Sequence, residues 1–300
     1  MVFVGKKTPG VILVFGAEGM LGTTLCPSLS AMGYRVLRQS RRGVTGVTLD
    51  PLNGAAVAAA LSAHQPYAVI NLIAESNVDA CQMDIQRAYL ANVRTVENLV
   101  SAMAGERSTA HLIQISTDHV YNGVGPHEES TALPGNVYAL TKYAGELAAL
   151  RVGATVIRTN FFGRSRSSSR ISFSDWVVNS LRSKAEFTVF EDVYFSALHM
   201  TTLTQYVAQV IRQRHSGVFN VGCKDGLSKA EFAQSLARSL GLDTSWMKIG
   251  SVKDVPLSAS RPSDMRMDIH SFERSFSVEM PCMAEQIALA VGEYGESIKC

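Results

Sequence analysis

"VILVFGAEGMLG", residues 11–22, runs from an apolar stretch directly into a glycine-rich turn. The first six residues are typical of a buried strand. Gly16, Gly19 and Gly22 follow at the opening of a helical segment, where glycines let the backbone turn tightly and approach a pyrophosphate. A lone glycine triplet is also compatible with an ordinary tight turn. Its place in the first strand–helix unit favours nucleotide binding.

Outward from this turn, short apolar runs alternate with segments of helical composition. The expected strands are 11–16, 34–38, 67–73, 110–116 and 154–160, and the expected helices are 20–32, 53–64, 84–103 and 137–150. This alternation predicts an α/β protein with a Rossmann-type, doubly wound parallel sheet covered by helices on both faces. Ligands are then expected beyond the carboxyl ends of the strands.

The alternation of strand-like and helical segments becomes less regular after about residue 160. Helical stretches are expected at 173–183, 200–214, 228–240 and 284–294, with short strands between them. We therefore predict a dinucleotide-binding domain at 1–160 and a smaller α/β substrate-binding lobe at 161–300, with residues 219–221 as a segment that can return to the main sheet. The basic loop "GRSRSSSRIS" (163–172) is either a mobile lid or a solvated loop.

Composition and charge exclude several classes of protein. The chain has 300 residues, 46% of them hydrophobic, and a net charge of +2, so we expect a large buried core and no broad basic face for nucleic acid. Neither a secretory signal at "MVFVGKKTPG" nor an apolar run long enough to span a membrane is expected. The five cysteines show no metal-ligand spacing, so we expect no metal and no disulfide framework. These features predict a cytoplasmic protein with small-molecule partners.

The segment after the second expected strand bears on the choice of cofactor. It reads "RQSRR" at 38–42, and no acidic residue occurs between Glu18 and Asp50. NAD-binding sheets carry an acid here for the ribose 2′-hydroxyl, whereas arginine accommodates the 2′-phosphate of NADP. Arg38, Ser40 and Arg41 therefore favour NADP(H) over NAD(H), and a solvated turn is the alternative. Asp50 is placed either to contact adenine or to cap a turn.

"NVYALTKYAGE", residues 136–146, places Tyr138 and Lys142 four positions apart on an expected helix, hence on one face. A nearby ammonium favours the ionised phenol and so makes it a better proton donor. The preceding strand ends in Ser116 and Thr117, whose hydroxyls can bind an oxygen that gains charge. The pair would otherwise be an ordinary surface pair. Glu146, four residues further on, is interpreted as a mere neighbour on the helix.

These segments together resemble the extended short-chain dehydrogenases/reductases, and most closely the dTDP-4-dehydrorhamnose reductase branch. The resemblance rests on "GAEGMLG", "NLIAESNVDACQMD", "ISTDHVYNG", "VYALTKYAGE", "VIRTNFFG" and "SRPSDMRMD". It implies NADPH-dependent reduction of the 4-keto group of a nucleotide-linked 6-deoxysugar, in the biosynthesis of polysaccharide precursors. It also implies that Thr117, Tyr138 and Lys142 are catalytic.

The resemblance extends to the binding residues. It implies that Gly16, Gly19, Met20 and Leu21 surround the pyrophosphate, that Leu72, Ile73 and Ala74 line the cofactor together with Tyr138 and Lys142, and that Asp118, His119 and Arg261 contact the substrate. The chain departs from the family pattern at Leu72 and Ile73, where small residues are usual, at His119, where tyrosine is usual, and at Phe161, where tryptophan is usual. The alternative to substrate contact for Arg261 is a structural ion pair with Asp264 or Asp268.

Two other functions fit the same resemblance. One is a nucleotide-sugar epimerase or dehydratase of the same superfamily, although the missing acid after the second strand disfavours a tightly held NAD. The other is a non-catalytic, NADP-binding regulatory subunit like the beta subunit of methionine adenosyltransferase, which the intact Thr117, Tyr138 and Lys142 set disfavours. The sequence leaves open whether the protein forms a homodimer.

Overall fold

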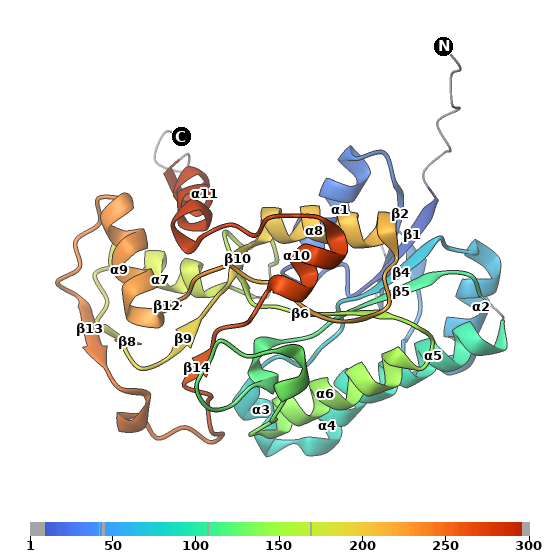
Figure 1. Ribbon diagram of the computed structural model, residues 1–300, viewed down its shortest axis with the longest axis horizontal. Coiled ribbons are helices and arrows are strands. Elements are labelled where there is room, and N and C mark those ends of the chain that lie inside the picture. Colours follow the sequence, from blue (N-terminus) through green and yellow to red (C-terminus); the bar gives the residue numbers. More distant parts are fainter. Residues whose placement is uncertain (1–9, 42, 44–45, 107, 169, 296–300) are drawn as a thin grey trace, which may run out of the picture.

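A seven-stranded parallel sheet forms the centre of the molecule (Figure 1). The computed structural model describes residues 10–41, 43, 46–106, 108–168 and 170–295; residues 1–9, which hold most of the segment judged for a secretory signal, and Cys300 lie outside this range. The strand order is β11-β6-β5-β4-β1-β2-β3, which confirms the predicted doubly wound fold. The strands are β1 (Val11–Phe15), β2 (Arg35–Ser40), β3 (Val47–Thr48), β4 (Ala68–Asn71), β5 (His111–Ile115), β6 (Thr155–Arg158) and β11 (Gly217–Asn220).

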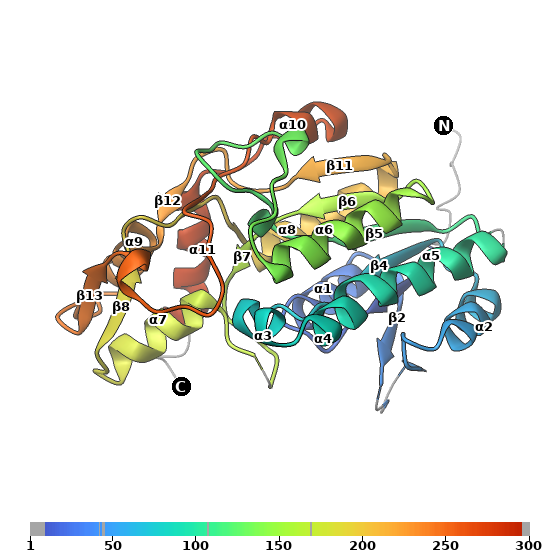
Figure 2. The same ribbon diagram turned by 90° about the horizontal axis from the view of Figure 1, so that it is seen from below.

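Helices cover both faces of this sheet because successive strand residues point to opposite sides. On β1, Ile12 and Val14 join one core cluster, and Leu13 and Phe15 join the other. Figures 1 and 2 show the two helical layers that enclose these clusters. The first layer contains α1 (Gly22–Ala31), α8 (Met200–Gln213) and α10 (His270–Phe276), and the second contains α2 (Gly54–His64), α5 (Thr95–Gly105) and α6 (Val137–Leu150).

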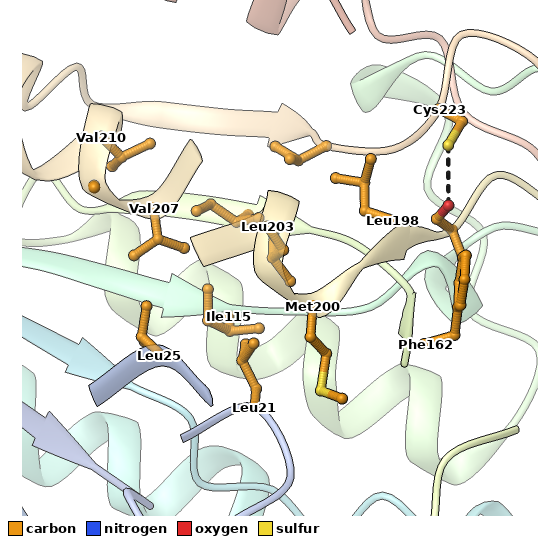
Figure 3. Packing of buried hydrophobic residues seen from close by; sticks show 14 of the residues in the cluster. Leu21, Leu25, Ile115, Phe162, Leu198, Met200, Leu203, Val207, Val210 and Cys223 are labelled. Atoms are coloured by element: carbon orange, nitrogen blue, oxygen red, sulfur yellow. Dashed lines mark hydrogen bonds between the residues drawn. The ribbon is translucent and has the colours of Figure 1, made fainter. Parts of the chain in front are cut away.

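The core beneath α1 and α8 is drawn in Figure 3, where Leu21 and Leu25 face Leu203 and Val207. Leu21, 4% exposed, belongs to this hydrophobic core. Its side chain therefore packs against the core beside α8, and its assignment to the pyrophosphate stays a prediction.

The expected helix at 84–103 is interrupted. The structure has α3 (Val78–Met83), α4 (Ile85–Tyr89), a π-helical turn at Leu90–Arg94 and then α5. Within that turn the buried Asn92 accepts a hydrogen bond from the backbone N–H of Glu75 and donates to Thr141 on α6. The extra residue of a π-turn allows such a reach across elements. Periodicity alone does not reveal this break.

The second half of the chain supplies three small sheets and three further helices (Figure 1). They are β7 (Phe161–Phe162) with β10 (Leu198–His199), β9 (Tyr194–Phe195) with β12 (Leu227–Ser228) and β14 (Asp264–Met265), β8 (Phe187–Phe190) with β13 (Met247–Gly250), and α7 (Phe173–Arg182), α9 (Lys229–Ser239) and α11 (Met283–Gly295). All four helices expected after residue 160 are present. β11 returns to the main sheet beside β6, as expected.

One continuous core joins the two halves, since a single hydrophobic cluster runs from Ile12 on β1 to Tyr294 on α11. We retain the division at residue 160 as a proposal for the functional lobes. Cys26, Cys81, Cys223 and Cys282 are free thiols. None of the helices within the described residues is long and apolar enough to cross a lipid bilayer.

A buried ion pair between Arg158 on β6 and Glu146 on α6 joins this helix to the sheet. Arg158 on β6 donates from Nη2 to Glu146 Oε2 at 2.7 Å, and both side chains are almost fully buried, at 2% and 1% exposure. Ser116 also donates to Glu146, and Arg158 Nη1 donates to the Tyr121 hydroxyl at 2.9 Å. The interpretation of Glu146 as a mere neighbour was therefore wrong, because its carboxylate is the partner of a charge inside the protein.

Replacing Glu146 with glutamine is expected to lower the free energy of unfolding by about 3–5 kcal/mol, since it leaves the buried Arg158 guanidinium without a counter-charge. Urea denaturation at pH 7 measures this change. As a matched control, Glu186→Gln removes an acid that pairs with Lys248 at the exposed surface, and should change the value by less than about 1 kcal/mol. Equal effects of the two substitutions would contradict the structural role given to Glu146.

Candidate active site

A cavity of about 730 Å³ opens at the carboxyl ends of β1, β2 and β4. This is the edge at which doubly wound sheets bind ligands. Eight of the residues predicted to bind a cofactor line it, namely Gly16, Gly19, Ser40, Arg41, Asp50, Leu72, Ile73 and Ala74. Met20 and Leu21 pack against the core, and Tyr138 and Lys142 lie outside the cavity lining.

The glycine turn has the geometry that dinucleotide binding requires. Gly16 has a φ of 75°, which L side chains rarely adopt, and a Cβ on Gly22 would lie 2.5 Å from the carbonyl oxygen of Ala17. The glycines thus bring the start of α1 close to the end of β1. No side chain caps the first turn of α1, so its N–H groups suit a phosphate.

The two arginines near the end of β2 lie on different sides of the strand. Arg41 and Ser40 line the cavity, whereas Arg38 lies on the other side of β2 and contacts Cys26 on α1. Between them Gln39 is buried, accepts a hydrogen bond from the Gly16 N–H at 3.2 Å and donates to Leu49 O at 2.8 Å. Residue 42 lies outside the described residues. The neutral amide of Gln39 thus lies next to the glycine turn. Arg38 and Arg41 are three positions apart, so the alternation of side chains along an extended chain places them on opposite sides, and this signal was available in the sequence.

The opposite wall contains charged residues that the sequence did not single out. Glu75, after β4, forms an ion pair with Arg87 and lies 3.8 Å from Arg170 Nη2. Arg170 also donates to Ser76, and Ser167 donates to Glu18 O at 3.3 Å. Ser167 and Arg170 of the basic loop 163–172 therefore reach the glycine turn and the segment after β4, and Arg170 lines the cavity. Ser169 lies outside the described residues.

Thr117 and Tyr138 meet at the end of β5. Tyr138, 8% exposed, is the second residue of α6, whose N-terminus Asn136 caps by accepting from the Ala139 N–H at 2.8 Å. Burial raises the pKa of Tyr138 well above its ordinary value, and hydrogen bonding to Thr117 offsets part of that rise. The phenol is therefore protonated at neutral pH.

Lys142 lies one turn further along α6. Its ammonium donates to the backbone oxygen of Ile115 at 2.6 Å, and burial lowers its pKa to about 8. The charges that act on Tyr138 come from other residues, such as Asp118 and Arg170. This differs from the expectation that Lys142 lowers the pKa of the phenol, because in the structure the ammonium lies on the backbone of β5.

Asp118 and His119 continue the chain directly beyond Thr117. Asp118 is buried and accepts from Asn160 Nδ2 at 2.7 Å; burial raises its pKa to about 6. The His119 ring packs edge-on against the Tyr138 ring, with 5.5 Å between centroids. Burial lowers the pKa of His119 to about 3, so the ring is neutral, and its buried Nδ1 has no hydrogen-bond partner among the described residues.

Arg261 joins the lobe to the nucleotide-binding half. It donates to Asp79 on α3 at 2.7 Å and to Ala259 O at 3.0 Å. The alternative partners considered for Arg261 were therefore wrong, since Asp264 pairs with Arg266 instead. Arg261 still lies near enough to His119 for its charge to lower the pKa of the ring. No group of His, Cys, Asp or Glu within the described residues is arranged to hold a metal ion.

This site, at the end of a dinucleotide-binding sheet, defines an NAD(P)-dependent oxidoreductase of the extended short-chain dehydrogenase/reductase type. Residues 10–295 match the family model described as the RmlD substrate binding domain, and the chain belongs to that family.

Similar proteins include reductases and a subunit of methionine adenosyltransferase. The dTDP-4-dehydrorhamnose reductase of Salmonella typhimurium is 26% identical, covering 90% of this chain and 93% of that protein. The methionine adenosyltransferase 2 subunit beta of Xenopus laevis is 28% identical, covering 87% and 81%. The crystal structure of a dTDP-4-dehydrorhamnose reductase from Bacillus anthracis, in complex with NADP, has a TM-score of 0.86 at 22% identity and covers 95% of this chain and 99% of that one. The last comparison concerns the fold.

Replacing Lys142 with methionine is expected to raise the free energy of unfolding by about 1–3 kcal/mol at pH 7. The substitution removes a buried ammonium whose pKa falls from 10.5 to about 8, while the lost bond to Ile115 offsets part of the gain. The gain is complete below pH 8 and disappears as the pH rises from 8 towards 10.5, where folded and unfolded lysine are both neutral.

Urea denaturation at several pH values measures this difference. Lys248→Met, at an exposed lysine, serves as the control and should leave stability within about 0.5 kcal/mol. A Lys142→Met protein less stable than the parent at pH 7 would contradict the cost assigned to the buried ammonium.

Proposed function

We propose that the protein reduces the 4-keto group of a nucleotide-linked 6-deoxysugar with NADPH. The observation that carries this proposal is the buried, protonated phenol of Tyr138 beside the Thr117 hydroxyl, at the sheet edge that also bears the dinucleotide cavity. A reduction needs a proton donor that still holds its proton at neutral pH. Membership of the family and the reductases among the similar proteins support the substrate class.

In this mechanism Tyr138 donates its proton to the oxygen of the sugar carbonyl, and Thr117 donates a hydrogen bond to the same oxygen as its charge grows. The nicotinamide supplies the hydride when bound. Lys142, on the same face of α6, can donate to a ribose hydroxyl while it keeps its bond to Ile115 O, because one backbone bond uses only one of its three N–H donors. Asp118 and His119, next along the chain, bind sugar hydroxyls.

The residues present fit a dinucleotide. The cavity volume is within the range of cofactor sites, and the uncapped first turn of α1 suits the pyrophosphate. We propose NADP(H) rather than NAD(H), because Arg41 and Ser40 line the ribose end and the buried neighbour there is Gln39, which carries no negative charge to repel a 2′-phosphate.

A homodimer also remains part of the proposal. Leu140 and Leu147, seven residues apart on α6 and therefore on one face, are more than half exposed, and Met83 and Ile85 nearby are exposed as well. An apolar stripe on a helix favours association with a second copy.

Tyr138→Phe is expected to lower the rate of NADPH oxidation with dTDP-4-keto-6-deoxyglucose or its 3,5-epimer by about 10²–10⁴-fold, because the proton donor is lost. NADPH affinity should be unchanged, since the phenyl ring keeps its packing against Val78 and Cys81. Absorbance at 340 nm measures the rate. The control is Tyr143→Phe on the same helix, which should keep the parent rate.

The outcomes separate the proposal from its alternatives. NADPH binding without turnover across a panel of 4-keto nucleotide sugars would favour a regulatory subunit, like the methionine adenosyltransferase relative. Conversion of a nucleotide hexose without added cofactor would favour an epimerase or dehydratase. A Tyr138→Phe protein as active as the parent would exclude the phenol as the donor.

Arg41→Ala is expected to weaken NADPH binding by roughly 10- to 100-fold, which corresponds to the loss of a hydrogen bond to a charged group. NADH binding should stay the same, because NADH lacks the 2′-phosphate. Fluorescence titration measures both constants. Arg38→Ala is the matched control, since Arg38 faces Cys26 instead of the cavity. A loss of NADPH affinity in the Arg38 variant alone would reverse the assignment.

A further inference from the structure

Lys229 is a cation in an unusual place. It is the first residue of α9, after the Ser228 cap, where the positive end of the helix dipole disfavours a positive side chain. Its Nζ lies 3.4 Å from the centroid of the Phe195 ring and 4.6 Å from that of Phe173. Two aromatic faces therefore hold the ammonium in position by cation–π attraction. Glu231, two residues further on, is occupied in the capping box with Ser228.

The ammonium is directed towards the end of β5. Its charge lowers the pKa values of both Asp118 and His119, so it lies near the residues that follow Thr117. No carboxylate among the described residues forms an ion pair with it, and Asp118 is already bonded to Asn160. Burial lowers the pKa of Lys229 to about 8, which leaves the side chain mainly charged at neutral pH.

Arg261, the second cation near His119, differs in one respect. Its guanidinium is bonded to the Asp79 carboxylate and to a backbone oxygen. The charge of Arg261 is therefore compensated by direct bonds, whereas Lys229 has only the through-space attraction of Asp118, which raises its pKa. A partly buried cation without a bonded counter-charge is costly unless an anion completes the site. The charges of both cations lower the pKa of His119, and the Nδ1 of this neutral ring, which has no hydrogen-bond partner among the described residues, can accept a hydrogen bond from the same ligand.

We propose that the Lys229 ammonium, held on Phe195 and Phe173 beside Asp118 and His119, binds the diphosphate of the nucleotide sugar. This inference rests on the proposed function, since a nucleotide-linked sugar carries its diphosphate next to the sugar ring. Tyr138 and His119 hold the sugar at one end, and Lys229 holds the diphosphate at the other. Lys229 is thus a substrate-binding residue that sets the distance between the diphosphate and the carbonyl.

Isothermal titration with dTDP, UDP and GDP, and with thymidine, uridine and guanosine, tests this inference. Lys229→Met keeps the aliphatic stem on the aromatic rings and removes only the charge. We expect it to weaken binding of the preferred nucleoside diphosphate roughly 10- to 100-fold. Binding of the matching nucleoside and of NADPH should not change. Lys229→Arg should restore most of the affinity.

Lys224→Met is the matched control, because it removes an exposed lysine of the same charge on the preceding loop. Its affinity for the diphosphate should equal that of the parent. Equal affinity in the Lys229→Met protein would overturn the inference, and so would a parallel loss of nucleoside binding, which indicates a structural effect.

The test also separates this inference from the proposed function. If the parent reduces a 4-keto nucleotide sugar but Lys229→Met binds diphosphates normally, the inference alone fails. If the parent binds a nucleoside diphosphate through Lys229 but reduces no such sugar, the function fails and the binding site stands. If the parent binds none of the three diphosphates, the inference fails as well.

Discussion

The buried ion pair between Glu146 and Arg158 is the interaction on which the active-site geometry depends. It joins α6 to β6, and Ser116 bonds the same carboxylate from the end of β5. Two charges in a dry interior are stable only when each keeps its partner in good geometry, so this contact fixes the rotation of α6 about its axis. Lys142 and Tyr138 lie one and two turns before Glu146 on that helix, so the orientation of α6 also fixes where their side chains point. The residue that positions the phenol is therefore eight residues away from it.

Burial acts in opposite directions on the two groups of the Tyr-Lys pair. It raises the pKa of the phenol and lowers that of the ammonium to about 8, since the charged form of each is the less favoured one away from water. The phenol thus keeps its proton until it transfers that proton to a developing alkoxide. The buried Lys142 ammonium lowers the free energy of unfolding, and the same burial places it beside β5. Such a conflict between stability and placement is expected at sites that serve chemistry.

The alternating pattern predicted nearly all of the fold, and the reason is physical. Each strand of a parallel sheet is buried on both faces, so its apolar run is visible in the sequence, and α6 has the predicted bounds. The site was harder to predict. Spacing places Glu146 on the same face as Lys142, but only the approach of Arg158 on β6, 12 residues after Glu146, makes that face an interior one. The break at Leu90–Arg94 was hidden as well, because a π-turn depends on the distant partners of Asn92.

The sequence motif and the structure favour different cations for substrate binding, Arg261 and Lys229, and the difference lies in whether each charge is already bonded to a carboxylate. A motif identifies Arg261 because an arginine–proline pair recurs there, but a motif does not show whether the guanidinium is already paired. Asp79, 182 residues earlier in the chain, supplies that pairing. Lys229 belongs to no motif, and its signal is a physical conflict. It is a cation at the positive end of a helix, held on two aromatic rings, and no carboxylate among the described residues is bonded to it. A position that is unfavourable for a cation in the free protein is retained when a bound ligand makes it favourable, and this is the effect that the proposed diphosphate has on Lys229.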